Sequence, residues 1–215
     1  GTVNYNLQYH FEEKNNWKTS IGLNGMQQSN RNKGVEQLIP EYSLFDVGGF
    51  VYSQKKINDV TLSGGLRFDN RSLNSKELMD GSDEKFAAVK KSFSNVSGSV
   101  GLAYQVNRQV TLKINIARGF RAPSIPELAS NGVHEGTNRY EYGEQNLKSE
   151  TSLQSDAGIE IKNEHVSFSA AVFLNSMSNF IYYRKLEAQG GGDSIITDGS
   201  DQLYAFRFEQ NNAIL

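Results

Sequence analysis

Apolar and polar residues alternate along most of this chain. The clearest example covers residues 110–116. Its apolar members share one side and are Val110, Leu112, Ile114 and Ile116. Its polar members share the other side and are Thr111, Lys113 and Asn115. A period of two residues predicts a β-strand whose two faces meet different surroundings.

The same period predicts nine strands. They lie near residues 2–10, 16–26, 42–54, 58–69, 93–105, 110–116, 153–161 and 165–183, and from residue 203 onward. Residues 42–54 are apolar on both faces, so the period does not assign their sides. Helix signals are limited to short turns within residues 75–91 and 126–129.

The connections between these strands alternate between short and long. The short ones are residues 12–15, 55–57, 106–108 and 163–164, and the long ones are 27–41, 71–92, 119–150 and 184–202. Successive turns of an antiparallel meander lie at opposite ends of the sheet, so all long connections meet at one end. This asymmetry is typical of outer-membrane barrels. Strands of about ten residues, tilted by about 45°, span the roughly 25 Å that such a barrel needs.

We therefore expect an all-β fold: an antiparallel up-and-down meander of about nine strands that forms part of a large transmembrane β-barrel. A soluble β-sandwich is the alternative, with shorter strands and mixed loop lengths. No run of residues approaches the roughly twenty apolar residues of a membrane-spanning helix. A mean hydropathy of −0.54 fits a barrel, whose strands alternate in polarity.

Aromatic residues gather near the ends of the predicted strands. They are Tyr5, Tyr9, Tyr52, Phe68, Tyr104, Tyr182, Tyr183 and Tyr204. In a membrane barrel such residues form girdles at the two interfaces. Ordinary packing within a sheet is the alternative.

The composition of the chain argues against several classes of function. The chain of 215 residues has 24 acidic and 22 basic side chains, a net charge of −2, which argues against a nucleic-acid partner. It has no cysteine, so disulfides and thiolate chemistry are excluded. Its three histidines show no zinc-site spacing, and no catalytic or phosphate-binding motif is present. We expect no enzymatic activity, no resident metal and no cofactor.

Several segments resemble one family. Residues 65–69, GLRFD, resemble the strand-end motif GLRYD of TonB-dependent outer-membrane receptors. Residues 116–128, IARGFRAPSIPEL, are similar to that family's A-x-G-F-R-A-P-x-x-x-E-L motif. Residues 140–143, followed by 146–152, resemble its G-N-x-x-L-K-P-E-x-S segment, with Gln145 before Asn146 and Ser149 in place of the proline. Residues 173–181 and 208–213 resemble two further strand motifs.

The resemblance implies a function in the bacterial outer membrane. Receptors of this family capture a scarce nutrient and import it with energy that TonB delivers through a plug domain. The ligand implied first is a ferric siderophore, with haem, a vitamin or a glycan as other candidates. The implied partners are this small molecule, outer-membrane lipid, and TonB acting through the plug. A passive porin or structural barrel, or a soluble β-sandwich binding module, would be the alternative function.

The resemblance also bears on domain organisation. Large receptors of this kind have 22 strands and a plugged lumen. Because nine strands are fewer than half of that number, we expect residues 1–215 to be a partial barrel domain, an interior piece without plug or C-terminal strands. An open barrel has unpaired strand edges. We expect those edges to pair with another copy or to close on themselves.

The long connection from residue 119 to 150 is the expected ligand-facing segment. The side chains that we expect to contact the ligand are Arg121, His134, Glu135, Arg139 and Tyr140. Arginine and tyrosine suit anionic or aromatic ligands. Packing of these side chains against the lumen wall is the alternative for each of them.

Overall fold

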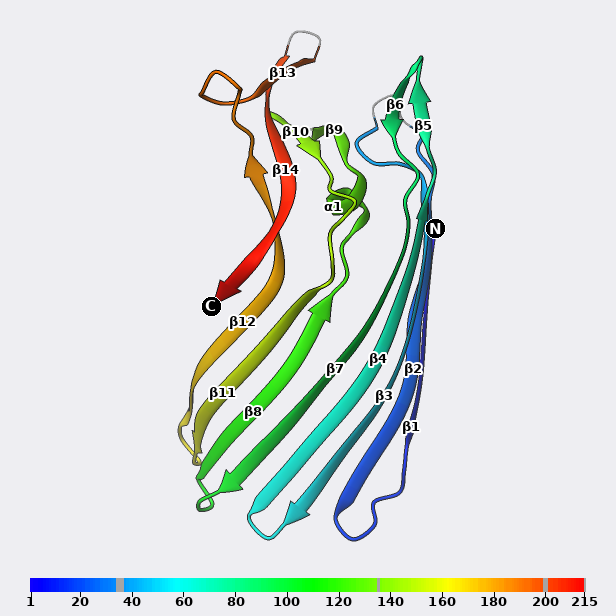
Figure 1. Ribbon diagram of the computed structural model, residues 1–215. Coiled ribbons are helices and arrows are strands. Elements are labelled where there is room, and N and C mark those ends of the chain that lie inside the picture. Colours follow the sequence, from blue (N-terminus) through cyan, green and yellow to red (C-terminus); the bar gives the residue numbers. More distant parts are fainter. Residues whose placement is uncertain (34–36, 135, 199–200, 215) are drawn as a thin grey trace.

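The computed structural model describes residues 1–33, 37–134, 136–198 and 201–214, which form one large curved sheet (Figure 1). Nine long strands make up most of this sheet. They are β1 (Thr2–His10), β2 (Trp17–Asn30), β3 (Tyr42–Ile57), β4 (Val60–Ser75), β7 (Lys90–Gln105), β8 (Val110–Arg121), β11 (Glu150–Lys162), β12 (Ser167–Lys185) and β14 (Asp201–Ile214).

The predicted meander is confirmed. The long strands pair in chain order, and each pair is antiparallel. Several strands exceed the predicted lengths: β3, β4 and β7 have 16 residues each. The short turns lie together at the lower end of Figure 1 and the long connections at the upper end.

One predicted element is wrong. The short helical turn expected within residues 75–91 is a hairpin of β5 (Leu78–Asp80) and β6 (Asp83–Phe86). Asp80 pairs with Asp83 across a two-residue turn, in which Gly81 has a φ of +64°. Such a turn requires positive φ, and glycine adopts it without the steric cost of a side chain. The turn therefore overrides the helix-forming residues on either side.

The other predicted helix is present as α1 (Ile125–Ala129). The carboxylate of Glu127 accepts hydrogen bonds from the backbone N–H of Ser124, at 2.7 Å, and from its hydroxyl, at 3.0 Å. These bonds fix the start of the helix, and Pro126 in the first turn needs no N–H partner there. Among the described residues, no helix is long and apolar enough to cross a membrane.

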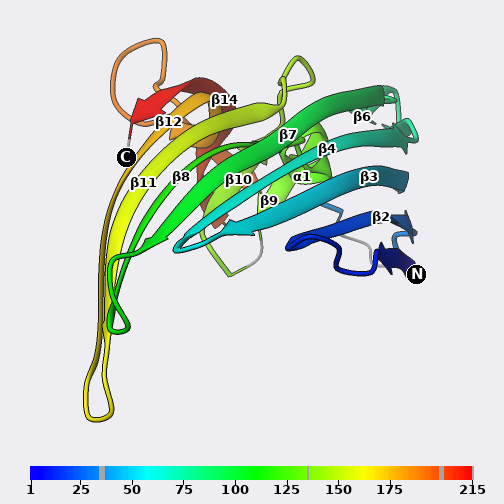
Figure 2. The ribbon, with the colours of Figure 1, turned by 90° about the horizontal axis from the view of Figure 1, so that it is seen from below.

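The long connection 119–150 carries structure of its own. After α1 it forms a hairpin of β9 (Asn131–His134) and β10 (Arg139–Tyr142). β10 pairs with β14 in parallel, which departs from the meander, and β13 (Ile195–Asp198) also pairs with β14. Figure 2 shows α1, β9 and β10 on the concave side of the sheet.

The two faces of the sheet differ in polarity. The register places apolar residues in rows on the convex face, for example Ile21, Val51 and Leu66. Leu66 is 63% exposed and Val100 is 70% exposed, because no second sheet covers this face in the described part of the chain. A broad exposed apolar surface is unusual on a soluble monomer but is what the lipid-facing side of a barrel requires.

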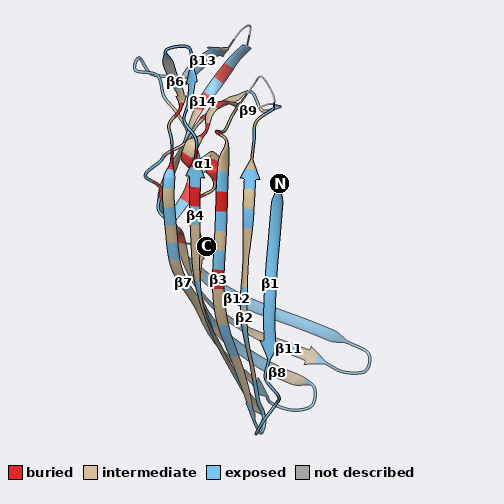
Figure 3. Ribbon diagram, turned by 90° about the vertical axis from the view of Figure 1, so that its right-hand side faces the viewer, coloured by how far each residue is buried: buried red, intermediate tan, exposed pale blue. Residues whose placement is uncertain are grey.

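The concave face is mostly polar, and its apolar core lies near the long connections. There, side chains of α1 pack against the inner sides of β3, β4 and β12. The buried members of this core are Leu44, Leu73, Val89, Ile125, Leu128, Leu147 and Ile181. Figure 3 shows the buried residues concentrated at this end, while the rest of the sheet is exposed or half-buried.

The aromatic residues divide between the two faces. Tyr9, Phe68 and Tyr104 lie on the convex face, as expected for girdle residues. Tyr52 and Tyr183 lie on the concave face, where the Tyr52 hydroxyl reaches Gln54 and the Tyr183 ring packs on Phe208. The girdle interpretation is therefore wrong for these two tyrosines. Alternate residues of a strand face opposite sides of the sheet, and these two belong to the set that faces the concave side.

Because the convex face is apolar and the concave face is polar, a charge introduced at two adjacent positions of one strand should affect barrel stability unequally. In the full-length protein, Val100→Lys places an ammonium near the middle of the convex apolar band, which we expect to cost about 2–4 kcal/mol of barrel stability. Ser99→Lys, one residue away on the concave face, should cost less than about 1 kcal/mol. Urea unfolding in lipid vesicles measures both. Equal costs for the two variants would contradict the assignment of the faces.

Candidate functional site

The candidate site lies at the end of the sheet with the long connections, on the concave side. The connection 119–150 crosses this region together with the upper parts of β12 and β14 (Figures 1 and 2). This region contains two clusters of polar side chains and, below them, a hollow in the concave face of the sheet.

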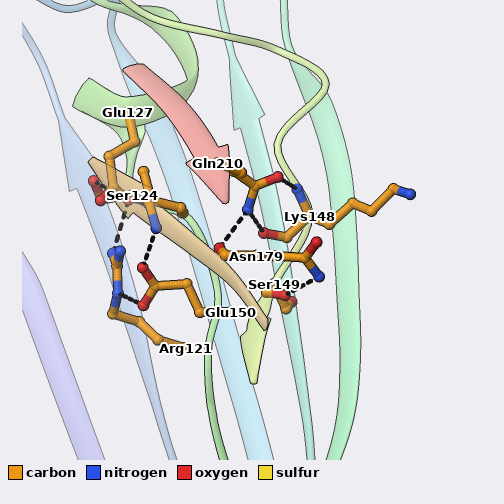
Figure 4. A network of polar contacts seen from close by, with 9 residues as sticks. Arg121, Ser124, Glu127, Lys148, Ser149, Glu150, Asn179 and Gln210 are labelled. Carbon is orange, nitrogen blue, oxygen red and sulfur yellow. Dashed lines mark hydrogen bonds and ion pairs between the residues drawn. The ribbon is translucent and has the colours of Figure 1, made fainter. Parts of the chain in front are cut away.

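The first cluster centres on Arg121, the last residue of β8. Its guanidinium donates to Glu150 at 2.6 Å and to Glu127 at 2.8 Å (Figure 4). The second oxygen of Glu150 accepts a hydrogen bond from the backbone N–H of Ile181. One arginine thus connects β8 to α1 and, through Glu150, to β12. The Glu150 side chain is only 6% exposed, and these charge-assisted bonds compensate for its burial.

Gln210 of β14 extends this network to the segment before β11. Its side-chain amide donates to the carbonyls of Lys148, at 2.7 Å, and Asn179, at 2.8 Å, and its oxygen accepts from the Lys148 N–H at 2.8 Å (Figure 4). Asn179 has a φ of +57° at the register shift in β12. Three backbone groups of irregular segments are therefore satisfied by one side chain, which holds the connection against the wall.

The second cluster lies on the β9–β10 hairpin. The buried carboxylate of Glu141 is 2.9 Å from Nδ1 of His134 and 3.9 Å from Nε of Arg139. The Arg139 guanidinium also lies 4.9 Å from the ring centre of Tyr183 and 5.7 Å from that of Phe206. These contacts combine an ion pair with cation–π interactions. Nε of Arg139 is buried and has no hydrogen-bond partner.

The hollow below the clusters has a volume of about 480 Å³. Its wall includes two ion pairs of the inner sheet face, Arg71 with Asp46 and Arg67 with Asp69, and it reaches Arg121. Arg71 binds Asp46 through two parallel hydrogen bonds of 2.8 and 2.7 Å. The wall thus carries charged side chains, and in each of these two ion pairs the opposite charges compensate one another. In the part of the chain that the structure describes, no group of three metal-ligating side chains occurs.

The structure brings together two of the five side chains predicted as ligand contacts, His134 and Arg139, on opposite strands of one hairpin. Arg121 belongs to the separate network with Glu150. The Tyr140 hydroxyl donates to Asn131 at 3.0 Å, which is a packing role within the hairpin. Glu135 lies outside the described residues.

Sequence reasoning missed the carboxylates that organise both clusters and the amide of Gln210. Ser124 and Glu127 have the spacing of a capping box, a signal that was available. Alternation within residues 139–142 would have placed Glu141 beside Arg139. No local pattern indicates that Glu150 pairs with Arg121, because 29 positions separate them.

Comparison with known proteins agrees with this architecture. The family model described as TonB dependent receptor-like, beta-barrel, matches residues 1–212. A curated relative, the ferric enterobactin receptor of Pseudomonas aeruginosa, is 31% identical over 96 residues, which are 40% of this chain and 13% of that protein. This chain thus matches only a small part of that receptor's length.

Solved structures show the same fold. A double mutant of the Serratia marcescens hemophore receptor HasR, in complex with its hemophore HasA and heme, superposes with a TM-score of 0.74 at 15% identity. The copper transporter OprC superposes with a TM-score of 0.73 at 16% identity. Each alignment covers 99% of this chain, but only 37% and 33% of the respective structures. The chain belongs to the TonB-dependent receptors of the Gram-negative outer membrane, and it forms part of their β-barrel.

Proposed function

We propose that this chain contributes the ligand-facing wall of a receptor that imports a scarce nutrient, with a ferric siderophore as the first candidate ligand. Import would draw on energy delivered by TonB through a plug domain. The observation that carries the proposal is the cluster of Arg139, His134 and Glu141 beside the rings of Tyr183 and Phe206. It lies at the end of the barrel where the long connections meet.

The chemistry of this cluster favours an anionic ligand with aromatic groups. A guanidinium held over aromatic rings offers both a cation and π surfaces. His134 is 43% exposed and adds a polar group at the same surface. A ferric catecholate siderophore combines negative charge with aromatic rings. The curated relative is named a ferric enterobactin receptor, which agrees with that class.

The neighbouring structures leave other ligands as alternatives. One is a hemophore receptor in complex with heme, and another is a copper transporter. Haem also combines carboxylates with an aromatic system, so it is the second candidate for the same cluster. A passive porin accords less well with the observations, because the ordered connection occupies the concave side of the sheet. A soluble binding module does not account for the exposed apolar face.

Growth of a deletion strain on defined nutrient sources distinguishes these candidate ligands. A deletion strain complemented with the full-length gene should grow on a ferric catecholate siderophore as its sole iron source, and an empty vector should not restore this growth. Growth on haem alone would replace the siderophore proposal with the haem alternative. Failure on all iron sources, with growth restored by copper, a vitamin or a glycan, would reject iron import.

Arg139 should matter for ligand affinity. We expect Arg139→Ala to weaken binding of a ferric catecholate to the full-length receptor about tenfold, because one cation–π and charge contact is worth about 1–2 kcal/mol. Arg139→Lys should recover part of the loss. Arg108→Ala, in a short turn at the other end of the sheet, is the matched control. Equilibrium binding measures all three, and unchanged affinity in Arg139→Ala would remove this cluster from the proposed site.

Gln210 should position the connection without contacting the ligand. Gln210→Ala leaves backbone groups of Lys148 and Asn179 without their partner, at a cost of about 1–3 kcal/mol. We expect faster amide exchange around residue 148, with little change in the exchange of β7 and β8. Gln202→Ala in the same strand is the control. Protection at residue 148 equal to that of the parent would show that the Gln210 amide does not hold this segment.

A further inference from the structure

The convex face carries a hollow that the proposed function does not use. It has a volume of about 680 Å³ and lies across β3, β4, β7, β8 and β11. Glycines line part of it, including Gly64 and Gly98, and the apolar side chains around them include Leu66, Val100 and Ile116. Missing side chains at the glycines leave a depression in a surface that is otherwise covered by apolar side chains.

Arg118 lines the same hollow. It follows Ile114 and Ile116 on the convex side of β8 and lies directly opposite Gly98 and Leu153 in the neighbouring strands. The concave-face arginines Arg67, Arg71 and Arg121 each pair with a carboxylate. Within the part of the chain that the structure describes, Arg118 donates from Nη1 to the carbonyl of Val96 and forms no ion pair. The remaining donors of its guanidinium are thus available to a bound anion.

The position of Arg118 along the strand indicates which leaflet it faces. β8 ends at Arg121, where the long connection begins, and long connections are external in outer-membrane barrels. On the same face the surface becomes polar above Val96, where Asn70 donates to Ser92 and Ser94. Arg118 therefore lies near the boundary between hydrocarbon and head groups of the outer leaflet. A long cationic side chain there reaches toward the head groups.

We infer that this hollow and Arg118 form a binding site for a phosphorylated glycolipid of the outer leaflet, lipid A. One acyl chain lies in the glycine-lined depression, and a phosphate accepts hydrogen bonds from the Arg118 guanidinium. Charge complementarity selects the occupant: the apolar depression alone would accept any acyl chain, whereas the unpaired guanidinium favours an anionic head group at this depth. The inference rests on the outer-membrane location of the barrel and is independent of the imported nutrient.

The test uses the full-length receptor, purified in detergent, depleted of lipid and titrated with diphosphoryl lipid A under native mass spectrometry. We expect Arg118→Gln to weaken lipid A binding about fivefold, the loss typical for one basic residue at an anionic surface. Arg118→Lys should retain most of the affinity. Lys113→Gln, on the concave side of the same strand, should leave it unchanged. The parent should prefer diphosphoryl over dephosphorylated lipid A, and Arg118→Gln should lose this preference.

A second variant tests the depression. A side chain at position 64 has room, since an added Cβ would lie 3.6 Å from the carbonyl oxygen of Ser99, an ordinary van der Waals distance. We expect Gly64→Val to fill the hollow and to weaken both forms of lipid A. Heat-modifiable migration on gels confirms folding of each variant, and ferric-ligand binding should be unaffected. Parent-like lipid A binding in Arg118→Gln, or equal binding of phosphatidylglycerol and lipid A by the parent, would overturn the inference.

Discussion

The constraint on which this structure depends is the parity of its strand positions. Each long strand directs alternate residues to opposite faces, and every pairing must keep the apolar set on the convex side. The register achieves this across all neighbours: Leu23 lies opposite Gly49, which lies opposite Phe68, which lies opposite Val96. A shift by one residue in any pair would direct a charged row, such as Arg67, Asp69 and Arg71, toward lipid. Such a shift would be costly at every position, so the register is strongly specified.

The same alternation leaves mostly polar residues on the concave side, and the long connection packs against this side. Near the long connections, that surface becomes apolar at Leu44 and Leu73, and α1 packs there. The Arg121–Glu150 pair then fixes the entry and exit of the connection, and Gln210 fastens its last residues to β14. A segment of about thirty residues is thereby held in a defined shape. This order allows Arg139 to occupy a fixed place beside Tyr183 and opposite His134, which the proposed ligand site requires.

Local sequence patterns predicted the features that depend on local physics. Period two predicted the strands, the connection lengths predicted which end of the sheet carries the long loops, and a short helical turn was expected at residues 126–129, where α1 lies. The hairpin at residues 78–86 was misjudged because the Asp80–Gly81 turn outweighs helix-forming neighbours. Contacts between distant segments had no local signal. The parallel pairing of β10 with β14 joins residues more than sixty positions apart, and it determines which side chains surround Arg139.

The central claim is that one face of this sheet meets lipid and the other meets the barrel interior. Residues 1–215 contain no cysteine, so a single cysteine placed along residues 96–104 of β7 and labelled with a fluorophore has no competing thiol within this region. In vesicles of brominated lipid, labels at positions 96, 98, 100, 102 and 104 of the full-length receptor should be quenched. Labels at the odd-numbered positions between them should not. Quenching that does not alternate along this strand would contradict the account.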